Sequence, residues 1–287
     1  MKPALFQYVA PESLDAAITE LAGDEGARPL AGGQSLIPTL NFRLAAPSKL
    51  VDLRKIEALR GIRVEGNVIR VGAMTRHREL ELDEAAHRAN PLIRDVLGNV
   101  AHIIVRNRGT IGGSLAHADA SAELPCLLVA TGGSVVARGP KGERTIAAED
   151  FFHFHLTTAL EQGEVLTEVR IPTLAPGTGY AFLEVARRHG DYALAGVCAL
   201  VMVGSGGACT VARLAACGIA PKATRLVDAE KALVGVRADG SFEIAAQAAR
   251  RYVTTGDDRN ASTAFRQDLV ATLVKRTVAT AFSRVAR

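Results

Sequence analysis

Apolar residues near the start of the chain recur at spacings that change from helix to strand. Residues 12–22 carry apolar side chains at helical spacing and are followed by Gly23, which predicts a short amphipathic helix that ends there. The segments 28–33 and 49–53 are short apolar runs beside turn-forming residues, and both are predicted as strands. The first of these strands runs directly into two adjacent glycines.

Alternating apolar and polar residues dominate the next part of the chain. Residues 61–72 and 133–148 each contain two alternating runs around a glycine-containing turn, a pattern typical of a β-hairpin. Residues 164–172 form a further alternating run that is predicted as a strand. Residues 75–101, between the hairpins, are predicted as helical in two pieces that break near Asn90 and Pro91.

The pattern changes after a segment rich in Pro, Gly and Thr at residues 173–178. Long apolar strands come first in this second half, and helices follow as a group. The strands are predicted at 180–187, 192–203 and 209–219, and the helices at 222–234, 241–254 and 262–285. Strands followed by grouped helices favour an α+β fold over a doubly wound sheet. We therefore predict two domains, residues 1–175 and residues 176–287.

Two glycine motifs, AGGQS at residues 31–35 and TIGGS at residues 110–114, share one pattern. Each has adjacent glycines followed by a small hydroxyl residue, directly after a segment predicted as extended. Glycine permits positive φ and close approach of a ligand to the backbone, and successive amide groups can form a nest for an anion. Paired glycines are also common in simple turns, so either motif alone indicates little. Together they predict a site for a diphosphate.

Other nucleotide-binding signatures are missing from the sequence. There is no GxxxxGK[ST] motif, which argues against a P-loop kinase or ATPase. The nearest approach to GxGxxG is GSGGAC at residues 204–209, and the residues that follow it alternate like a strand instead of opening a helix. A hairpin turn is therefore expected at this position.

Composition narrows the function classes. The chain has 287 residues, of which 48% are hydrophobic, so a large core is expected. No apolar run approaches the roughly 20 residues needed to span a bilayer, and the first 17 residues lack the pattern of a signal peptide, so a cytoplasmic location is predicted. The formal charge is +4, the basic residues are scattered and Trp is absent, which argues against nucleic-acid binding.

The cysteines and histidines show no metal-binding pattern. The four cysteines form no CxxC pair and are expected to be buried, reduced thiols. His153 and His155 flank Phe154 in a segment that is typical of packing. No metal is therefore predicted, and an iron–sulfur cluster in this chain is not expected.

Four segments together resemble one protein family. They are AGGQSLIP, RNRGTIGGSLAHADASAELP, LTEVRIP and RRHGDYALAGV, in the order and approximate spacing of that family. The chain resembles the FAD-binding medium subunits of molybdenum hydroxylases, such as the carbon monoxide dehydrogenase medium subunit and the flavin domain of xanthine dehydrogenase. The resemblance implies a two-part FAD-binding domain of the vanillyl-alcohol-oxidase/PCMH type. A C-terminal antiparallel sheet with a small helical bundle is expected to follow it.

The resemblance also implies the residues that contact the cofactor. The two glycine motifs would hold the FAD diphosphate, Glu123 would bond on the ribose or adenine side, Leu166 would neighbour the adenine, and Tyr192 would lie near the isoalloxazine ring. The full predicted set is Leu30, Ala31, Gly32, Gly33, Gln34, Ser35, Leu36, Ile37, Thr110, Ile111, Gly112, Gly113, Ser114, Glu123, Leu166 and Tyr192. Gln34 stands where many relatives have His, and its amide can still donate a hydrogen bond. No nucleophile or general base is predicted, because the redox chemistry belongs to the cofactor.

The partners are implied in the same way. Family members form a heterotrimer, often dimerised, with a large molybdopterin-binding subunit and a small subunit that holds two [2Fe–2S] clusters. The medium subunit passes electrons through FAD to NAD, a quinone or oxygen. The lack of a cysteine constellation in this chain fits that division of labour.

Two other functions stay open at the level of sequence. A self-contained FAD oxidase or dehydrogenase would act on its own substrate, and the small C-terminal region argues against this because such enzymes usually carry a larger substrate cap. A scaffold that has lost FAD is the other alternative, and intact glycine pairs in both motifs argue against it. The substrate of the complex and its terminal acceptor are not indicated.

Overall fold

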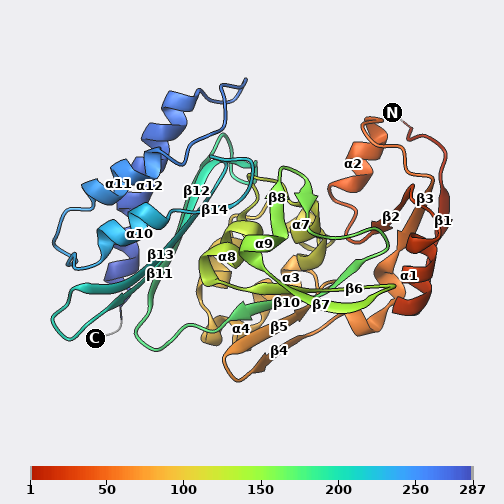
Figure 1. Cartoon of the computed structure of the whole chain (residues 1–287), viewed down its shortest axis with the longest axis horizontal. Helices are drawn as coiled ribbons and strands as arrows, with labels where there is room; N and C mark the ends of the chain where they lie inside the picture. The colour runs from red at the N-terminus through yellow and green to blue at the C-terminus, as the bar shows by residue number, and fades with distance from the viewer. Residues whose placement is uncertain (1, 286–287) are drawn as a thin grey trace.

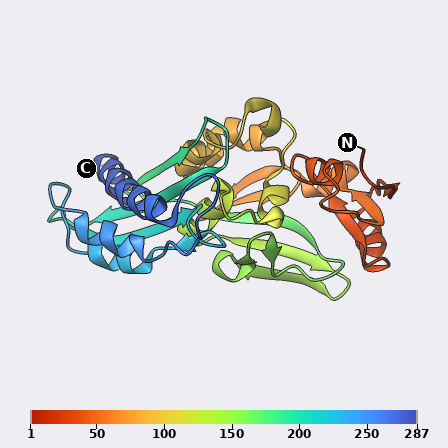
Figure 2. The ribbon, with the colours of Figure 1, turned by 90° about the horizontal axis from the view of Figure 1, so that it is seen from above.

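The computed structural model describes residues 2–285 and shows an elongated molecule with its N-terminal strands at one end and its last helices at the other (Figures 1 and 2). The N-terminal part contains a three-stranded parallel sheet in the order β1-β3-β2. The helix predicted at 12–22 is confirmed: Ser13 caps it, and its apolar face is buried. The elements of this part are β1 (Gln7–Val9), α1 (Leu14–Ala22), β2 (Ala27–Leu30), α2 (Leu36–Asn41) and β3 (Lys49–Asp52), followed by 3-10 turns at Leu53–Lys55 and Glu57–Leu59.

The middle of the molecule is built on a five-stranded antiparallel sheet in the order β4-β5-β10-β6-β7. Both predicted hairpins and the predicted strand at 164–172 belong to it. In the central strand, Val169 pairs with Val71 on one side and Val135 on the other, and all three side chains are buried. The strands are β4 (Ile62–Glu65), β5 (Val68–Gly72), β6 (Ser134–Gly139), β7 (Gly142–Ala147) and β10 (Val165–Pro172).

Short helices cover this sheet. The predicted break near Pro91 is confirmed, and a second break occurs at Asp83, whose side chain caps the next helix by accepting from the Ala86 amide at 2.7 Å. The region predicted as two helices therefore contains three, α3, α4 and α5. The elements are α3 (His77–Leu82), α4 (Glu84–Ala89), α5 (Leu92–Leu97), α6 (Ile103–Arg106), α7 (Ile111–His117), α8 (Glu123–Thr131), α9 (Ala148–Phe151), and the small hairpin β8 (Phe152–Phe154) and β9 (Thr157–Thr158).

The C-terminal part is a four-stranded sheet in the order β11-β12-β13-β14 with helices packed on it. The predicted helix at 222–234 is wrong at its start, because residues 224–225 form β14 and pair with Ala215 and Ala216 of β13. The helix begins only at Val227. The elements are β11 (Gly179–Ala186), β12 (Ala193–Val203), β13 (Cys209–Cys217), β14 (Thr224–Arg225), α10 (Val227–Leu233), α11 (Glu243–Arg250) and α12 (Thr263–Ser283).

One apolar core runs from the middle sheet into the C-terminal sheet. Helix α8 contacts β12 and β13, and Cys126 of α8 shares a buried cluster with Cys198 and Cys217 of those strands. All four cysteines are buried free thiols, as predicted. Because this cluster crosses residues 173–178, the division of the chain at residue 175 stays a prediction. Between residues 2 and 285, no helix is both long and apolar enough to cross a membrane.

Candidate functional site

The two glycine motifs lie against each other, although about eighty residues separate them in the sequence. A Cβ atom on Gly32 would come within 2.5 Å of the Arg108 carbonyl oxygen, and one on Gly113 would come within 3.3 Å of the Ala31 Cβ. Glycine is thus required at Gly32 because another backbone fills the space that a side chain would occupy. The prediction that a ligand takes this space is wrong for Gly32, since the neighbour is the second motif.

The first motif presents a row of free backbone donors. Residues 31–35 are irregular backbone between β2 and α2, and Gly33 has a φ of +74°, a conformation that favours glycine. The amide groups of residues 32–35 donate to no acceptor within the described part of the chain. Successive unpaired amides of this kind form an anion-binding concavity. The first motif therefore has the unpaired amides that the predicted nest requires, and the nest itself stays a prediction.

The second motif is built differently. Its glycines are in the first turn of helix α7, which Thr110 caps by accepting from the Gly113 amide at 3.1 Å. The Ile111 amide donates to the Thr75 carbonyl at 3.0 Å. The Gly112 amide donates to the Ala73 carbonyl at 2.9 Å. These amides are already paired, so the second motif contributes a rigid platform and the Ser114 hydroxyl, and the predicted nest is wrong at this position.

His77 supports this platform. The sequence alone did not predict a role for this residue. Its ring is buried, its Nε2 atom is 2.9 Å from the Thr110 carbonyl oxygen, and it packs against Gly109. Burial lowers the pKa of His77 to about 4, so the ring is neutral at physiological pH and Nε2 donates to Thr110. No motif surrounds His77, and only the folded contact indicates its role.

A second group of predicted residues meets on the side of the C-terminal sheet. Tyr192 lies in the turn between β11 and β12 and is half exposed, and its hydroxyl lies near the side chain of Ser35 in the first motif. Partial burial and the nearby charge of Asp119 raise the pKa of Tyr192 to about 12. Gly190 of the same turn packs against His102, which holds the turn beside the segment that leads into the second motif. The structure thus brings Tyr192 to the glycine motifs.

Glu123 is buried at the start of α8 and forms part of a carboxyl pair. Burial raises the pKa of Glu123 to about 7, and Asp119 raises it further in the same direction. Burial, with the charge of Glu123, raises the pKa of Glu184 on β11 to about 8. The Oε2 atom of Glu184 is inaccessible and has no hydrogen-bond partner in residues 2–285. Protonated carboxyl groups at these positions can donate hydrogen bonds to a ligand's hydroxyl or ring atoms.

This carboxyl pair predicts a pH-dependent stability. The folded chain holds the Glu184 proton more tightly than the unfolded chain, so the stabilisation is complete below about pH 4.5 and is lost as pH rises through about 8. The free energy of unfolding should therefore fall by about 1–3 kcal/mol between pH 5.5 and pH 8.5. Glu184→Gln should flatten this slope in urea unfolding experiments, and the exposed control Glu25→Gln should not. An unchanged slope in Glu184→Gln would contradict the assignment.

The remaining predicted residues have two environments. Leu30 is nearly buried, Ile37 is exposed by about a third, and both line a hollow on the first motif. Leu36 packs partly against a small apolar cluster with Leu30. Leu166 is buried within the large core cluster. Its predicted contact with adenine stays a prediction.

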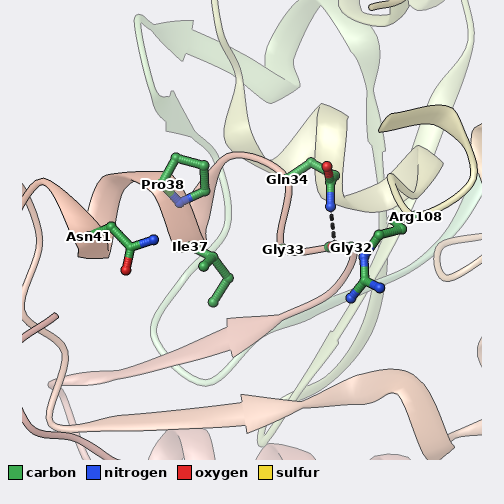
Figure 3. Close-up of a pocket in the computed structure, with 7 residues that line it drawn as sticks. All are labelled: Gly32, Gly33, Gln34, Ile37, Pro38, Asn41 and Arg108. Carbon is green, nitrogen blue, oxygen red and sulfur yellow. Dashed lines mark hydrogen bonds between the residues drawn. The ribbon is translucent and has the colours of Figure 1, made fainter. Parts of the chain in front are cut away.

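A hollow of about 320 Å³ opens directly on the first motif (Figure 3). Its lining comes from both motifs' segments: the backbone of Gly32 and Gly33, the side chains of Gln34 and Ile37, and Arg108 from the segment before the second motif. Gln34 folds back so that Nε2 donates to the Gly32 carbonyl at 3.4 Å. Among the described residues, no group of three or more His, Cys, Asp or Glu side chains is arranged to hold a metal ion.

These features fit the FAD that the resemblance predicts. A row of free amides suits a diphosphate, the hydroxyls of Ser35 and Ser114 add donors, and a buried carboxyl group suits a ribose or a ring nitrogen. Tyr192 supplies an aromatic surface beside the same motif. Bound FAD would supply redox chemistry that no side chain of this group can perform.

Comparison with known proteins agrees with this site. Residues 4–174 match the family described as "FAD binding domain in molybdopterin dehydrogenase", and residues 180–281 match the "CO dehydrogenase flavoprotein C-terminal domain". The chain is 39% identical to subunit alpha of the 6-hydroxypseudooxynicotine dehydrogenase complex of Paenarthrobacter nicotinovorans, covering 99% of this chain and 97% of that protein. It is 37% identical to the carbon monoxide dehydrogenase medium chain of Hydrogenophaga pseudoflava, with each chain covered completely.

Solved structures show the same architecture. A chain of reconstituted CO dehydrogenase from Oligotropha carboxidovorans superposes with a TM-score of 0.96 at 36% identity, covering 99% of this chain and 100% of that chain. A chain of quinoline 2-oxidoreductase from Pseudomonas putida 86 gives a TM-score of 0.91 at 40% identity, with 99% of each chain covered.

Proposed function

We propose a role for this chain from one premise: it belongs to the FAD-binding medium subunits of molybdenum hydroxylase-type dehydrogenase complexes. It is therefore a flavoprotein subunit of an oxidoreductase. When bound here, FAD would accept electrons from the [2Fe–2S] clusters of a small partner subunit and deliver them to NAD, a quinone or oxygen. A large molybdopterin-binding subunit would oxidise the substrate.

The observation that carries this proposal is the row of free amides on a loop that a second, rigid motif holds in place. The protein's task is to bind and orient the cofactor, and the unpaired amides of this loop are the groups that would do so. The amides of residues 32–35 would hold the diphosphate, while Gly32 fixes the loop against Arg108 and Gly109. Tyr192, in the turn before β12, lies near Ser35 of the same loop. A change at either motif would therefore affect cofactor binding.

The experiment is to purify the chain alone and then together with its two partner subunits. We expect a yellow chain whose flavin is released by acid and which does not turn over carbon monoxide, aldehydes or N-heterocycles by itself. Substrate-dependent reduction of the flavin is expected only when both partners are present. Turnover by the isolated chain would support the self-contained flavoenzyme instead, and a colourless chain that cannot be reconstituted with FAD would contradict the flavoprotein role.

The proposed electron route also places the cofactor near a subunit interface. Electron transfer from a partner's cluster requires one edge of the flavin to lie close to that partner. The complex is expected to be a heterotrimer, often dimerised, in the cytoplasm, without nucleic acid. Size measurements on the co-purified complex test the stoichiometry.

A further inference from the structure

A second hollow, which we call the arginine hollow, lies on the first glycine motif. Its volume is about 170 Å³. It is lined by Leu30, Ala31, Gly32, Gly33, Ile37, Asp52, Arg54, Arg76 and Arg108. Three arginines from three separate segments of the chain therefore converge on the loop that carries the free amides.

The arginine hollow is only partly neutralised. Arg54 forms an ion pair with the buried Asp52 at 2.5 Å, and Tyr8 also donates to Asp52. Arg76 is half-buried and donates to the carbonyl oxygen of Arg108. The Arg108 side chain makes no ion pair or hydrogen bond with any residue between 2 and 285. One carboxylate thus faces three guanidinium groups.

The charged groups around the arginine hollow add to its excess of positive charge. Burial, with the positive charge of Arg60 close by, lowers the pKa of Arg76 from its ordinary value. Glu79 is the nearby acid that offsets part of this effect. The charges of Asp119 and Glu123 raise the pKa of Tyr192 instead, and neither residue lines the arginine hollow. A dinucleotide's negative charge is therefore favoured at the hollow and disfavoured near Tyr192.

We propose that the arginine hollow binds a phosphoryl group, held by the guanidinium groups of Arg76 and Arg108 beside the free amides of the first motif. Guanidinium groups match phosphate oxygens in geometry and charge, and such charge-assisted hydrogen bonds are stronger than neutral ones. The amides alone explain affinity for an anion, whereas the arginines add selectivity for a doubly charged group and a dependence on salt.

Two phosphorylated ligands share this chemistry. One is the diphosphate of FAD itself, in which case the inference rests on the proposed function and adds arginines to a site expected to use backbone groups alone. The other is the diphosphate of a second nucleotide, such as a pyridine dinucleotide acceptor, bound beside the loaded flavin. The two sources predict different results in binding experiments.

The test compares Arg76→Gln and Arg108→Gln with Arg276→Gln, in the full-length chain. Arg276 is exposed on α12 at the other end of the molecule, so its variant removes the same charge far from the hollow. FAD is titrated into flavin-free protein by fluorescence quenching at low and high salt. Inorganic pyrophosphate is then titrated calorimetrically into FAD-saturated protein. Arg76→Lys keeps the positive charge and shows whether a lost contact or altered folding causes an effect.

Each outcome decides the proposal. If FAD occupies the hollow, its Kd rises about 10- to 100-fold in the two Gln variants and less in Arg76→Lys, and the difference shrinks at high salt. If a second ligand occupies it, FAD affinity is unchanged, and pyrophosphate binding to the loaded wild type is lost in the variants. Wild-type affinity for both probes in both variants overturns the proposal. Failure of the wild type to bind FAD contradicts the proposed function, while pyrophosphate titration of the flavin-free chain still tests the hollow.

Discussion

Gly32→Ala is expected to abolish stoichiometric FAD binding while leaving the chain folded. The new Cβ would lie 2.5 Å from the Arg108 carbonyl oxygen and 2.8 Å from the Gly109 Cα, and both are backbone atoms that cannot rotate away. The two motifs must separate, which moves the free amides of residues 32–35 away from their platform. We expect the Kd for FAD to rise about 100-fold or more, equivalent to about 3 kcal/mol of binding free energy.

Gly206→Ala is the matched control for this variant. Gly206 lies in the turn between β12 and β13, and nothing is within 4 Å of the Cβ that alanine would add. This control should bind FAD like the wild type in the same fluorescence titration, and circular dichroism should show both variants folded. Wild-type affinity in a folded Gly32→Ala would mean that close docking of the two motifs is not required for the cofactor.

Phe182→Ala is expected to lower the thermal unfolding midpoint of the whole chain by about 10 °C. Phe182 lies on β11, is buried, and belongs to the apolar cluster that includes Cys126 of α8 and Cys198 of β12. Loss of a buried phenylalanine typically costs about 3–5 kcal/mol. Because this cluster spans the middle and C-terminal sheets, both should unfold in a single transition at the lower temperature.

Phe265→Ala provides the comparison. Phe265 is on α12, and about half of its side chain is exposed. Its replacement should shift the midpoint by only a degree or two. Differential scanning calorimetry distinguishes the possibilities. Two separate transitions in Phe182→Ala, with only one displaced, would show that the two sheets unfold independently and that the shared core does not couple them.

Local sequence signals predicted most of the helices and strands. The helices α1 and α12 have Ser13 and Ser262 as caps and end close to the predicted residues. Asp83 is a capping residue type, so the extra break in the 75–101 region had a signal in the sequence. No signal in the sequence marked the start of α10. Residues 224–225 are extended because they pair with β13, and that partner is fixed by the tertiary fold.

The candidate site was predicted less completely, for the same reason. Paired glycines identified both motifs, but the sequence could not show that Ala73 and Thr75 occupy the amides of the second motif. His77 and Arg76 contact that motif from a distant segment and belong to no recognisable pattern. The family resemblance supplied the cofactor and the fold, whereas the division of roles between the two motifs required the structure.

A structure of the complex with bound FAD would show whether the first glycine motif holds the diphosphate. We expect diphosphate oxygens within about 3 Å of backbone amide nitrogens in residues 32–35, with the second motif still packed against Gly32. A diphosphate bound elsewhere on the chain, with those four amides facing only solvent, would contradict it.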